Sequence, residues 1–488
     1  MFWSDGWLPQ LSSSAQALLR IGYGVLLLGT LLLALPHRKR FFVSERWSGY
    51  AQSSRVTDAI QNPATCPVIL AVWILCAAAI ICDRWTVAAA VVNLLLCRYF
   101  FIRMRWRGIL RGMGAPGFLA YWLAAAVFLL EFSARYAPAA RSLVALVLQV
   151  DFAVIILSAG VYKLTAGYAH NEGMELGLVN PEWGYWWPAY AKLPPRHWLF
   201  RALNHLGWGT EVAAALLMLF PTSRILGGCL LIASFGLLAT QIRLGLLCEM
   251  VMLCGVLYVP AGSLADKSLS ALIPAAPWPV ASGDMGLITA ALTAALWAYL
   301  ALLPLAHTGL WYNLYAKRHL PAALQRCLEA YTNAFGIIIW RVFSVDLVNF
   351  FIRIYRQSRV GGARTLVTTY GWRGGLRYSH VGECITLTSV FTTLKYYPGD
   401  TARFRDRLLR YARTVPCPGG AVLVFEYLSI RKDPGRFTFI PAAEYEVDLE
   451  SGGITERVLT DTVSVGAAHP ASPVHAGTRP GSYAPHGR

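Results

Sequence analysis

The segment Ser158-Ala159-Gly160-Val161-Tyr162-Lys163-Leu164 ends an apolar stretch that begins near residue 142, and its lysine lies where that stretch meets a polar region. A run rich in aromatic residues follows, Asn180-Pro181-Glu182-Trp183-Gly184-Tyr185-Trp186-Trp187. An α-helix rises 1.5 Å per residue, so about 20 apolar residues cross a bilayer. We therefore expect residues 142–163 to form a membrane-spanning helix with Lys163 at its end.

The composition of the whole chain agrees with a membrane protein. Of its 488 residues, 56% are hydrophobic and 14% are charged, whereas soluble domains carry about 25% charged residues. The ten cysteines form no Cys-x-x-Cys pair and no His/Cys cluster with zinc spacing, so we predict no metal site. The composition predicts a polytopic α-helical membrane protein, so we expect the lipid bilayer to be one of its partners.

The net charge of +17 raises the alternative of a nucleic-acid-binding protein. However, the arginines gather at the ends of apolar segments, where the positive-inside rule places them. A basic stripe interleaved with stacking aromatic residues, which such proteins use, is missing from the sequence. We predict no nucleic-acid partner.

Apolar periodicity predicts about nine transmembrane helices within a domain at residues 1–306, followed by a connecting helical segment at 307–340. The expected helices are near residues 17–35, 68–82, 85–102, 117–132, 142–163, 205–220, 224–241, 244–260 and 286–306. Basic residues concentrate in the segments 36–66 and 103–111. By the positive-inside rule these loops are cytoplasmic, which places the N-terminus outside the cell, and the loop 168–201 and everything after about residue 306 in the cytoplasm.

The composition changes from about residue 341 to 465, where β-branched and aromatic runs are bounded by Gly, Pro and Asp. We expect strands at 364–370, 384–391, 421–427 and 436–440, and one amphipathic helix at 401–413. This pattern predicts a soluble, β-rich α+β domain. Residues 466–488 are rich in Ala, Pro, Ser, Gly and His, and we expect a disordered tail there.

Ionisable side chains within apolar segments are costly, so each is a candidate functional residue. The candidates are Asp151, Lys163, Glu211, Arg243 and Glu249. For each of them the alternative is an interhelical ion pair or an interfacial charge. Asp151 and Lys163 would be about 18 Å apart on one helix, too far to pair directly.

Lys163 has a more specific interpretation as a catalytic base. A lysine in water is almost fully protonated at neutral pH, but desolvation among apolar and aromatic side chains favours the free amine. Lys163 ends an apolar helix and precedes a Trp-rich loop, so it is our candidate base. The alternative is a side chain that extends to the membrane interface.

The aromatic residues around Lys163 have two interpretations. Trp and Tyr gather at membrane interfaces in any case, and Asn180-Pro181-Glu182 is typical of the start of a short interfacial helix. Alternatively, a flat aromatic pocket would suit a quinone ring. The candidate quinone-binding residues are Tyr162, Tyr168, His170, Trp183, Trp186, Trp187 and His197.

At these residues the chain resembles the vitamin K-dependent gamma-carboxylase-like family, also called the HTTM (horizontally transferred transmembrane) group. The carboxylase carries Ala-Gly-Val-Lys-Lys-Leu at the end of a membrane helix, and residues 159–164 match it with Tyr162 in place of the first lysine. The resemblance continues through residues 196–200, Glu211 and Ser223-Arg224, and it is best over about 152–260.

The resemblance implies a mechanism in which Lys163, at the position of the second lysine, deprotonates a reduced quinone such as vitamin K hydroquinone or menaquinol. Oxygenation of that quinone then yields a strong base that acts on a peptide or protein substrate before CO₂ adds. The enzyme would be a lyase or an oxidoreductase. The family faces its site away from the cytosol, opposite to the orientation that the charge count predicts.

Two hypotheses therefore stand. In the first, the chain is a carboxylase-like enzyme that deprotonates or oxidises a lipophilic hydroquinone and couples this to modification of a partner substrate. In the second, it is a non-catalytic HTTM scaffold that acts as a binding, maturation or immunity factor. The second rests on Phe235, Gly236 and Ala239, which stand where the family has polar residues near its site.

Overall fold

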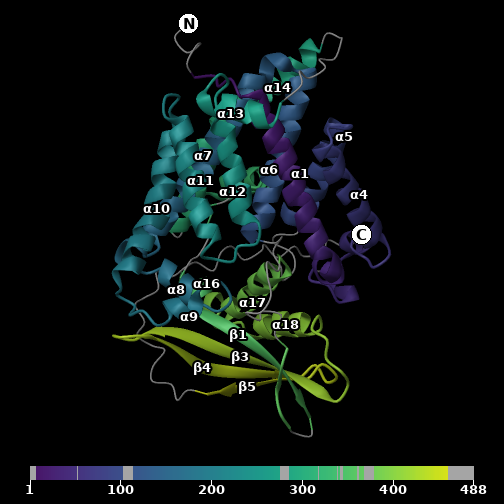
Figure 1. The fold of residues 1–488 in the computed structure, drawn as a ribbon. Helices are drawn as coiled ribbons and strands as arrows, with labels where there is room; N and C mark the ends of the chain where they lie inside the picture. Colours follow the sequence, from purple (N-terminus) through teal and green to yellow (C-terminus); the bar gives the residue numbers. More distant parts are fainter. Residues whose placement is uncertain are drawn as a thin grey trace.

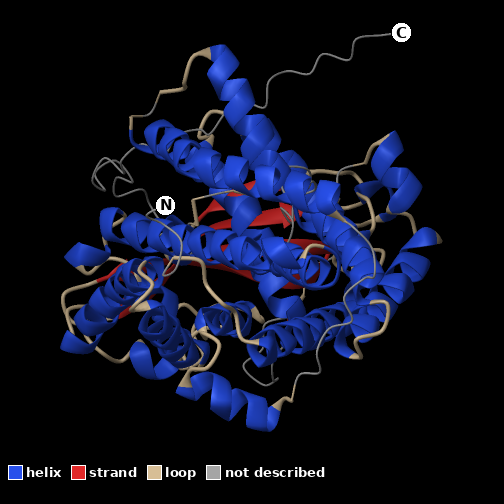
Figure 2. Ribbon diagram, turned by 90° about the horizontal axis from the view of Figure 1, so that it is seen from above, coloured by secondary structure: helices blue, strands red, loops and turns tan. Residues whose placement is uncertain are grey.

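The computed structural model describes residues 7–51, 53–102, 114–274, 285–316, 318–337, 339–340, 345–359, 362–367 and 378–459. Their helices stack side by side in a bundle above a single antiparallel sheet, with α17 and α18 between the two (Figure 1). Seen from above, the bundle covers the sheet (Figure 2). The predicted tail at 466–488 lies outside the described residues.

Each of the nine predicted apolar segments contains a helix. These are α1 (Ser13–Ala34), α4 (Thr65–Ile81), α5 (Thr86–Cys97), α6 (Gly114–Tyr136), α7 (Arg141–Thr165), α10 (Trp198–Leu219), α11 (Arg224–Ala239), α12 (Leu247–Gly255) and α14 (Gly286–Tyr315). Within the part of the chain that the structure describes, four stretches are both long and apolar enough to cross a membrane, namely Ser13–Phe42, Ala115–Tyr136, Pro138–Thr165 and Gly286–Tyr315.

Shorter elements connect these helices. They are α2 (Arg38–Phe42), α3 (Arg55–Ile60), α8 (Met174–Val179), α9 (Trp187–Tyr190), α13 (Leu264–Leu272), α15 (Ala322–Phe335) and α16 (Val345–Val348). Within the predicted connecting segment, α14 continues to Tyr315, so the helix outlasts the expected boundary at 306. α15 then lies against α14, where the Tyr331 hydroxyl donates to the Tyr299 carbonyl at 3.4 Å.

The sheet has the strand order β2-β1-β3-β4-β5, and every neighbouring pair is antiparallel. The strands are β1 (Phe350–Ser358), β2 (Thr365–Leu366), β3 (Ala421–Lys432), β4 (Phe437–Val447) and β5 (Ile454–Val458). The predicted strands at 421–427 and 436–440 are confirmed within β3 and β4. The predicted helix at 401–413 is confirmed as α18 (Thr401–Ala412). Of the predicted strand 364–370, the described part contains only β2.

The predicted strand at 384–391 is wrong, because these residues lie in α17 (Tyr378–Tyr396). Cys384, Leu387 and Phe391 are fully buried and recur at helical spacing, and this pattern outweighs the β propensity of the intervening threonines. The Thr386 hydroxyl is satisfied inside the helix, because its Oγ1 donates to the carbonyl of Gly382 at 2.7 Å.

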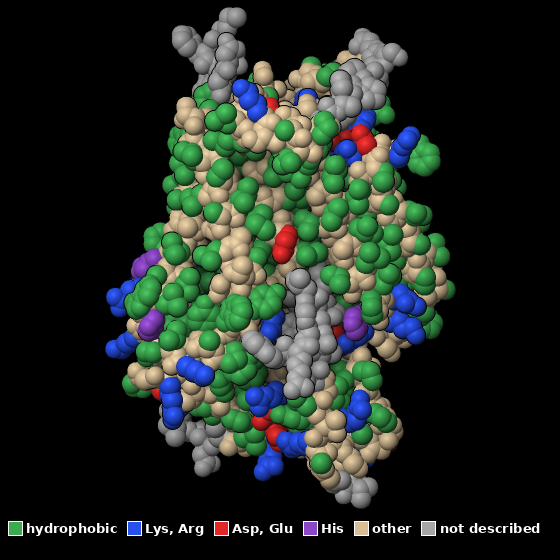
Figure 3. Space-filling model, viewed as in Figure 1, with side chains coloured by type: hydrophobic (Ala, Val, Ile, Leu, Met, Phe, Trp, Pro, Cys, Tyr) green, Lys and Arg blue, Asp and Glu red, His purple; other side chains and the backbone are tan. Residues whose placement is uncertain are grey.

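The sheet and the bundle share one continuous apolar core. A buried polar cluster also joins them, in which Glu383 of α17 pairs with Arg40 and accepts hydrogen bonds from the hydroxyls of Tyr50 and Tyr411. The surface differs between the two parts, since apolar side chains cover the bundle and many Lys and Arg side chains lie in the lower half (Figure 3). The C-terminal sheet is therefore packed firmly against the helices.

Candidate functional site

Lys163 lies at the contact between α7 and α10. Gly160, one turn earlier, brings the two helices close together: a Cβ at position 160 would lie 3.0 Å from the backbone nitrogen of Val212 and 3.1 Å from the Cβ of Glu211. This close approach lets the Lys163 ammonium form an ion pair with Glu211 Oε1. The Gly-x-x-Lys spacing of the motif thus has a direct structural role.

The Lys163–Glu211 pair is enclosed by protein. Lys163 is 5% exposed and Glu211 is 3% exposed. Sequence reasoning expected a free, desolvated amine, whereas the amine is buried and bound to a carboxylate. The second carboxylate oxygen, Glu211 Oε2, is buried and has no hydrogen-bond partner among the described residues. The site therefore combines an ammonium group with an unused acceptor.

Tyr168 lies beside this pair in the turn after α7. It is completely buried, and its ring packs against Gly173, where an added Cβ would lie only 2.3 Å from the ring. Burial raises the pKa of Tyr168 well above its ordinary value, and the carboxylates of Glu211 and Glu175 raise it further. The Tyr168 hydroxyl is thus within electrostatic reach of two buried carboxylates.

Glu175 connects this turn to the sheet. It is fully buried, pairs with Lys432 of β3 at 2.5 Å and accepts a hydrogen bond from Asn204 of α10 at 2.8 Å. The backbone nitrogen of Gly173 also donates to it. No pattern in the sequence singled out this contact, because its partners are far apart in the chain.

The start of the aromatic run binds the edge of β1 and does not form the interfacial helix that was one alternative. The Asn180 amide donates to the carbonyls of Val348 and Phe350 at 2.9 Å each, and Glu182 Oε1 accepts from the Ile352 nitrogen at 3.0 Å. Burial raises the pKa of Glu182 to about 8. These residues satisfy the Val348 carbonyl at the end of α16 and backbone groups of β1 beyond its short pairing with β2.

The aromatic side chains predicted to hold a quinone are dispersed. Trp183 is buried, Trp186 is half exposed and donates to the Thr240 carbonyl at 2.9 Å, and Trp187 packs edge-on against Phe439 of β4. His197 caps the start of α10 by accepting from the Leu199 nitrogen.

His170 is exposed, and Tyr162 is half-buried. Tyr168 lies close to the Lys163–Glu211 pair and Tyr162 lies close to Tyr168. The described contacts of Trp186, Trp187 and His197 lead to the 240 region, the sheet and the start of α10 instead.

The other predicted intramembrane groups have separate surroundings. Asp151 accepts a hydrogen bond from the indole of Trp122 at 2.8 Å. Arg243 donates to the Pro181 carbonyl at 3.0 Å and lies over the Tyr185 ring. Glu249 is half-buried, and its Oε2 has no hydrogen-bond partner among the described residues. Of these candidates, Glu211 is the one that contacts Lys163.

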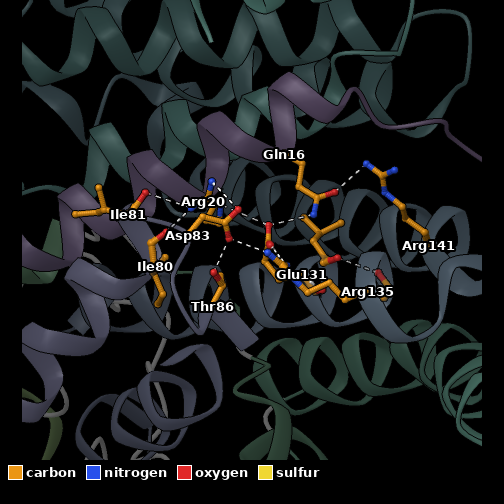
Figure 4. Close-up of polar contacts among 11 residues, drawn as sticks. Gln16, Arg20, Ile80, Ile81, Asp83, Thr86, Glu131, Arg135 and Arg141 are labelled. Carbon is orange, nitrogen blue, oxygen red and sulfur yellow. Dashed lines mark hydrogen bonds and ion pairs between the residues drawn. The ribbon is translucent and has the colours of Figure 1, made fainter. Parts of the chain in front are cut away.

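A second buried polar network, absent from the sequence-based candidates, lies at the end of the bundle away from the sheet (Figure 4). Glu131 of α6 is fully buried. It pairs with Arg135 and accepts a hydrogen bond from Gln16 at 3.1 Å, and Arg20 of α1 lies 3.8 Å from it.

Arg20 and Arg135 also reach Asp83, in the turn between α4 and α5. Arg20 donates to the carbonyl of Ile80 at 2.5 Å, which satisfies the C-terminal end of α4 (Figure 4). The network joins α1, α6 and the α4–α5 turn. Its signal in the sequence was a charge inside an apolar segment at positions 20 and 131, the same signal that marked Glu211.

Among the residues that the structure describes, no group of three or more His, Cys, Asp or Glu side chains is placed to hold a metal ion. Comparison with protein-family models, with curated proteins and with solved structures found no match to this chain.

Proposed function

We propose that this chain is an integral membrane protein with nine spanning helices whose sheet faces the cytoplasm. Four stretches long and apolar enough to span a bilayer support this proposal, as do the five further helices that run alongside them (Figure 1). The segment 36–66 lies on the side of the sheet, where Arg40 pairs with Glu383 of α17, and its basic residues favour the cytoplasmic side for the sheet.

We further propose that the Lys163–Glu211 pair removes a proton from a lipophilic hydroquinone. The observation that carries this proposal is the buried Glu211 Oε2, which accepts no hydrogen bond from the residues that the structure describes and lies beside a fixed ammonium. A hydroquinone hydroxyl would supply the missing hydrogen bond. Its O–H bond breaks as Glu211 Oε2 takes the proton, and the Lys163 ammonium stabilises the remaining quinol anion.

This assignment changes the role first expected for Lys163. In the resemblance to the carboxylase-like family, the lysine is the base. In this chain its ammonium is already paired, so Glu211 is the better proton acceptor and Lys163 the electrostatic partner. The reduced quinone would be the cofactor, and its activated form would modify a peptide or protein substrate as the resemblance implies.

Quinol turnover by purified protein tests the proposal. We expect wild-type protein in lipid nanodiscs to bind menaquinol or vitamin K hydroquinone and to consume it, and we expect Glu211→Gln to abolish consumption. Glu131→Gln is the matched control, because it removes an equally buried carboxylate from the opposite end of the bundle. Equal consumption by wild type and Glu211→Gln refutes the proposal.

The second candidate function is a non-catalytic membrane scaffold. The observation that favours it is the use of Asn180, Glu182 and Trp187 to fasten the sheet instead of lining a quinone site. Mass spectrometry of the lipid-soluble molecules that copurify with the protein distinguishes the two. A bound quinone together with turnover excludes the scaffold, whereas a stable, folded protein that neither binds nor consumes quinol supports it.

A further inference from the structure

We infer that Tyr168 and Glu175 form a proton path from the Lys163–Glu211 pair to water at the sheet. This inference rests on the proposed function, because a site that takes a proton from each hydroquinone must release it before the next turnover. Glu211 is enclosed by protein, so the proton needs intermediate groups that can accept and donate it.

One face of α10 sets the direction of this path. Asn204, Gly207 and Glu211 are spaced three and four residues apart, so they lie along one side of the helix. The first and last of them are separated by about 10.5 Å along the axis. Asn204 holds Glu175 at one end, and Glu211 holds Lys163 at the other.

Tyr168 lies in the interval between the two carboxylates. Its ring passes close to α10 at Gly207, where an added Cβ would be 3.6 Å from the ring, and it packs against Gly173 on the other side. Both glycines leave space that a side chain would fill. The hydroxyl lies within electrostatic reach of Glu211 and of Glu175.

The far end of the path reaches the aqueous side. Glu175 pairs with Lys432 at the end of β3, and the Lys432 side chain is 28% exposed. Along the path, Glu211 has Lys163 and Tyr168 as neighbours. Glu175 has Tyr168 and Lys432.

Each transfer conserves protons. The Tyr168 hydroxyl oxygen accepts the proton that leaves protonated Glu211, and its own proton moves to Glu175, which passes it to water beside Lys432. Glu211 is then a carboxylate again, and Tyr168 is unchanged. The step needs no oxidant or reductant, because no electrons are exchanged.

A pH-jump experiment tests the path. The probe is a lipophilic nitrophenol whose phenolate absorbs visible light, and the protein is the full chain in detergent micelles. After a rapid rise in pH, stopped-flow absorbance follows the loss of the proton from the bound phenol. We expect Tyr168→Phe, which keeps the ring, and Glu175→Gln to bind the probe as wild type does but to release the proton roughly 10²-fold more slowly.

Tyr190→Phe is the control, because Tyr190 lies in the same loop and donates to Gln241, away from the path. It should release the proton as fast as wild type. Unchanged rates in both Tyr168→Phe and Glu175→Gln overturn the path while leaving the proposed function intact. Failure of the folded wild type to bind the phenol refutes the site itself, and the path with it.

Discussion

Replacing Lys163 by methionine leaves the Glu211 carboxylate buried between α7 and α10 without its counter-charge. Both side chains are at least nine-tenths buried, and removing one partner of such a pair costs about 3–5 kcal/mol of folding stability. That loss corresponds to a decrease of roughly 10²–10⁴-fold in the folding equilibrium constant. Glu211→Leu should cost a similar amount, because it leaves the ammonium unpaired.

The double variant Lys163→Met/Glu211→Leu removes both charges and fills the space with apolar groups. We expect it to be within about 1 kcal/mol of wild type or more stable, since an apolar pair avoids the desolvation cost. The assay is reversible unfolding in mixed micelles, with the coupling energy taken from the double-mutant cycle.

Arg359→Met provides a comparison, because Arg359 pairs with Asp448 and Glu450 at the surface of the sheet domain. Its unfolding midpoint should stay close to that of wild type, since exposed ion pairs contribute little. The reasoning is refuted if Lys163→Met and Glu211→Leu each lower the free energy of unfolding by less than about 1 kcal/mol and the two decreases add in the double variant. The buried pair would then behave as an exposed one.

Three further predictions concern the surroundings of the site. Gly160→Ala places a Cβ 3.0 Å from the Val212 nitrogen, so thermal unfolding should reveal a loss of about 1–3 kcal/mol; an unchanged midpoint contradicts the close helix contact. Asn180→Ala removes two buried hydrogen bonds, to the carbonyls of Val348 in α16 and Phe350 in β1, and should cost about 1–3 kcal/mol, with faster amide exchange confined to α16 and β1; uniform exchange along the chain would contradict this. The pKa of Glu182 is raised to about 8 in the folded protein and is about 4.3 in the unfolded chain. Between these pH values the folded state therefore binds more protons than the unfolded state. As a result, the contribution of Glu182 to the free energy of unfolding falls as the pH rises through this range. The melting temperature of the wild type should therefore fall between pH 5 and 9, and Glu182→Gln should abolish the part of this fall that Glu182 causes. Identical dependence of the melting temperature on pH in wild type and Glu182→Gln would count against a buried carboxyl.

Sequence alone could predict the long apolar helices, because a long apolar run has few other stable arrangements. It also predicted β3, β4 and α18 from their residue patterns. The helix at Cys384 to Phe391 was missed because three of its intervening residues are threonine or serine, whose local preference opposed the helical spacing of the buried side chains. Local preference and tertiary burial conflict there, and burial prevails.

The site could be predicted only in part. Lys163 and Glu211 were each marked by their charge within apolar segments, yet they are 48 residues apart, and nothing in the spacing of the sequence states that the two helices bring them together. The same limit applies to Lys432 and Glu175, which meet across 257 residues. Asn180 and Glu182 looked like members of an aromatic interface, and their true partners are backbone groups of α16 and β1 that no side-chain pattern reveals.

The ionisation state of a phenol bound at the Lys163–Glu211 pair tests the central claim most directly. At a pH where the free nitrophenol is mostly neutral, the wild type and Glu131→Gln should show the absorbance of the bound phenolate, and Glu211→Gln should show that of the neutral phenol. A bound phenol that is equally neutral in all three proteins, or equally ionised in wild type and Glu211→Gln, would contradict the account.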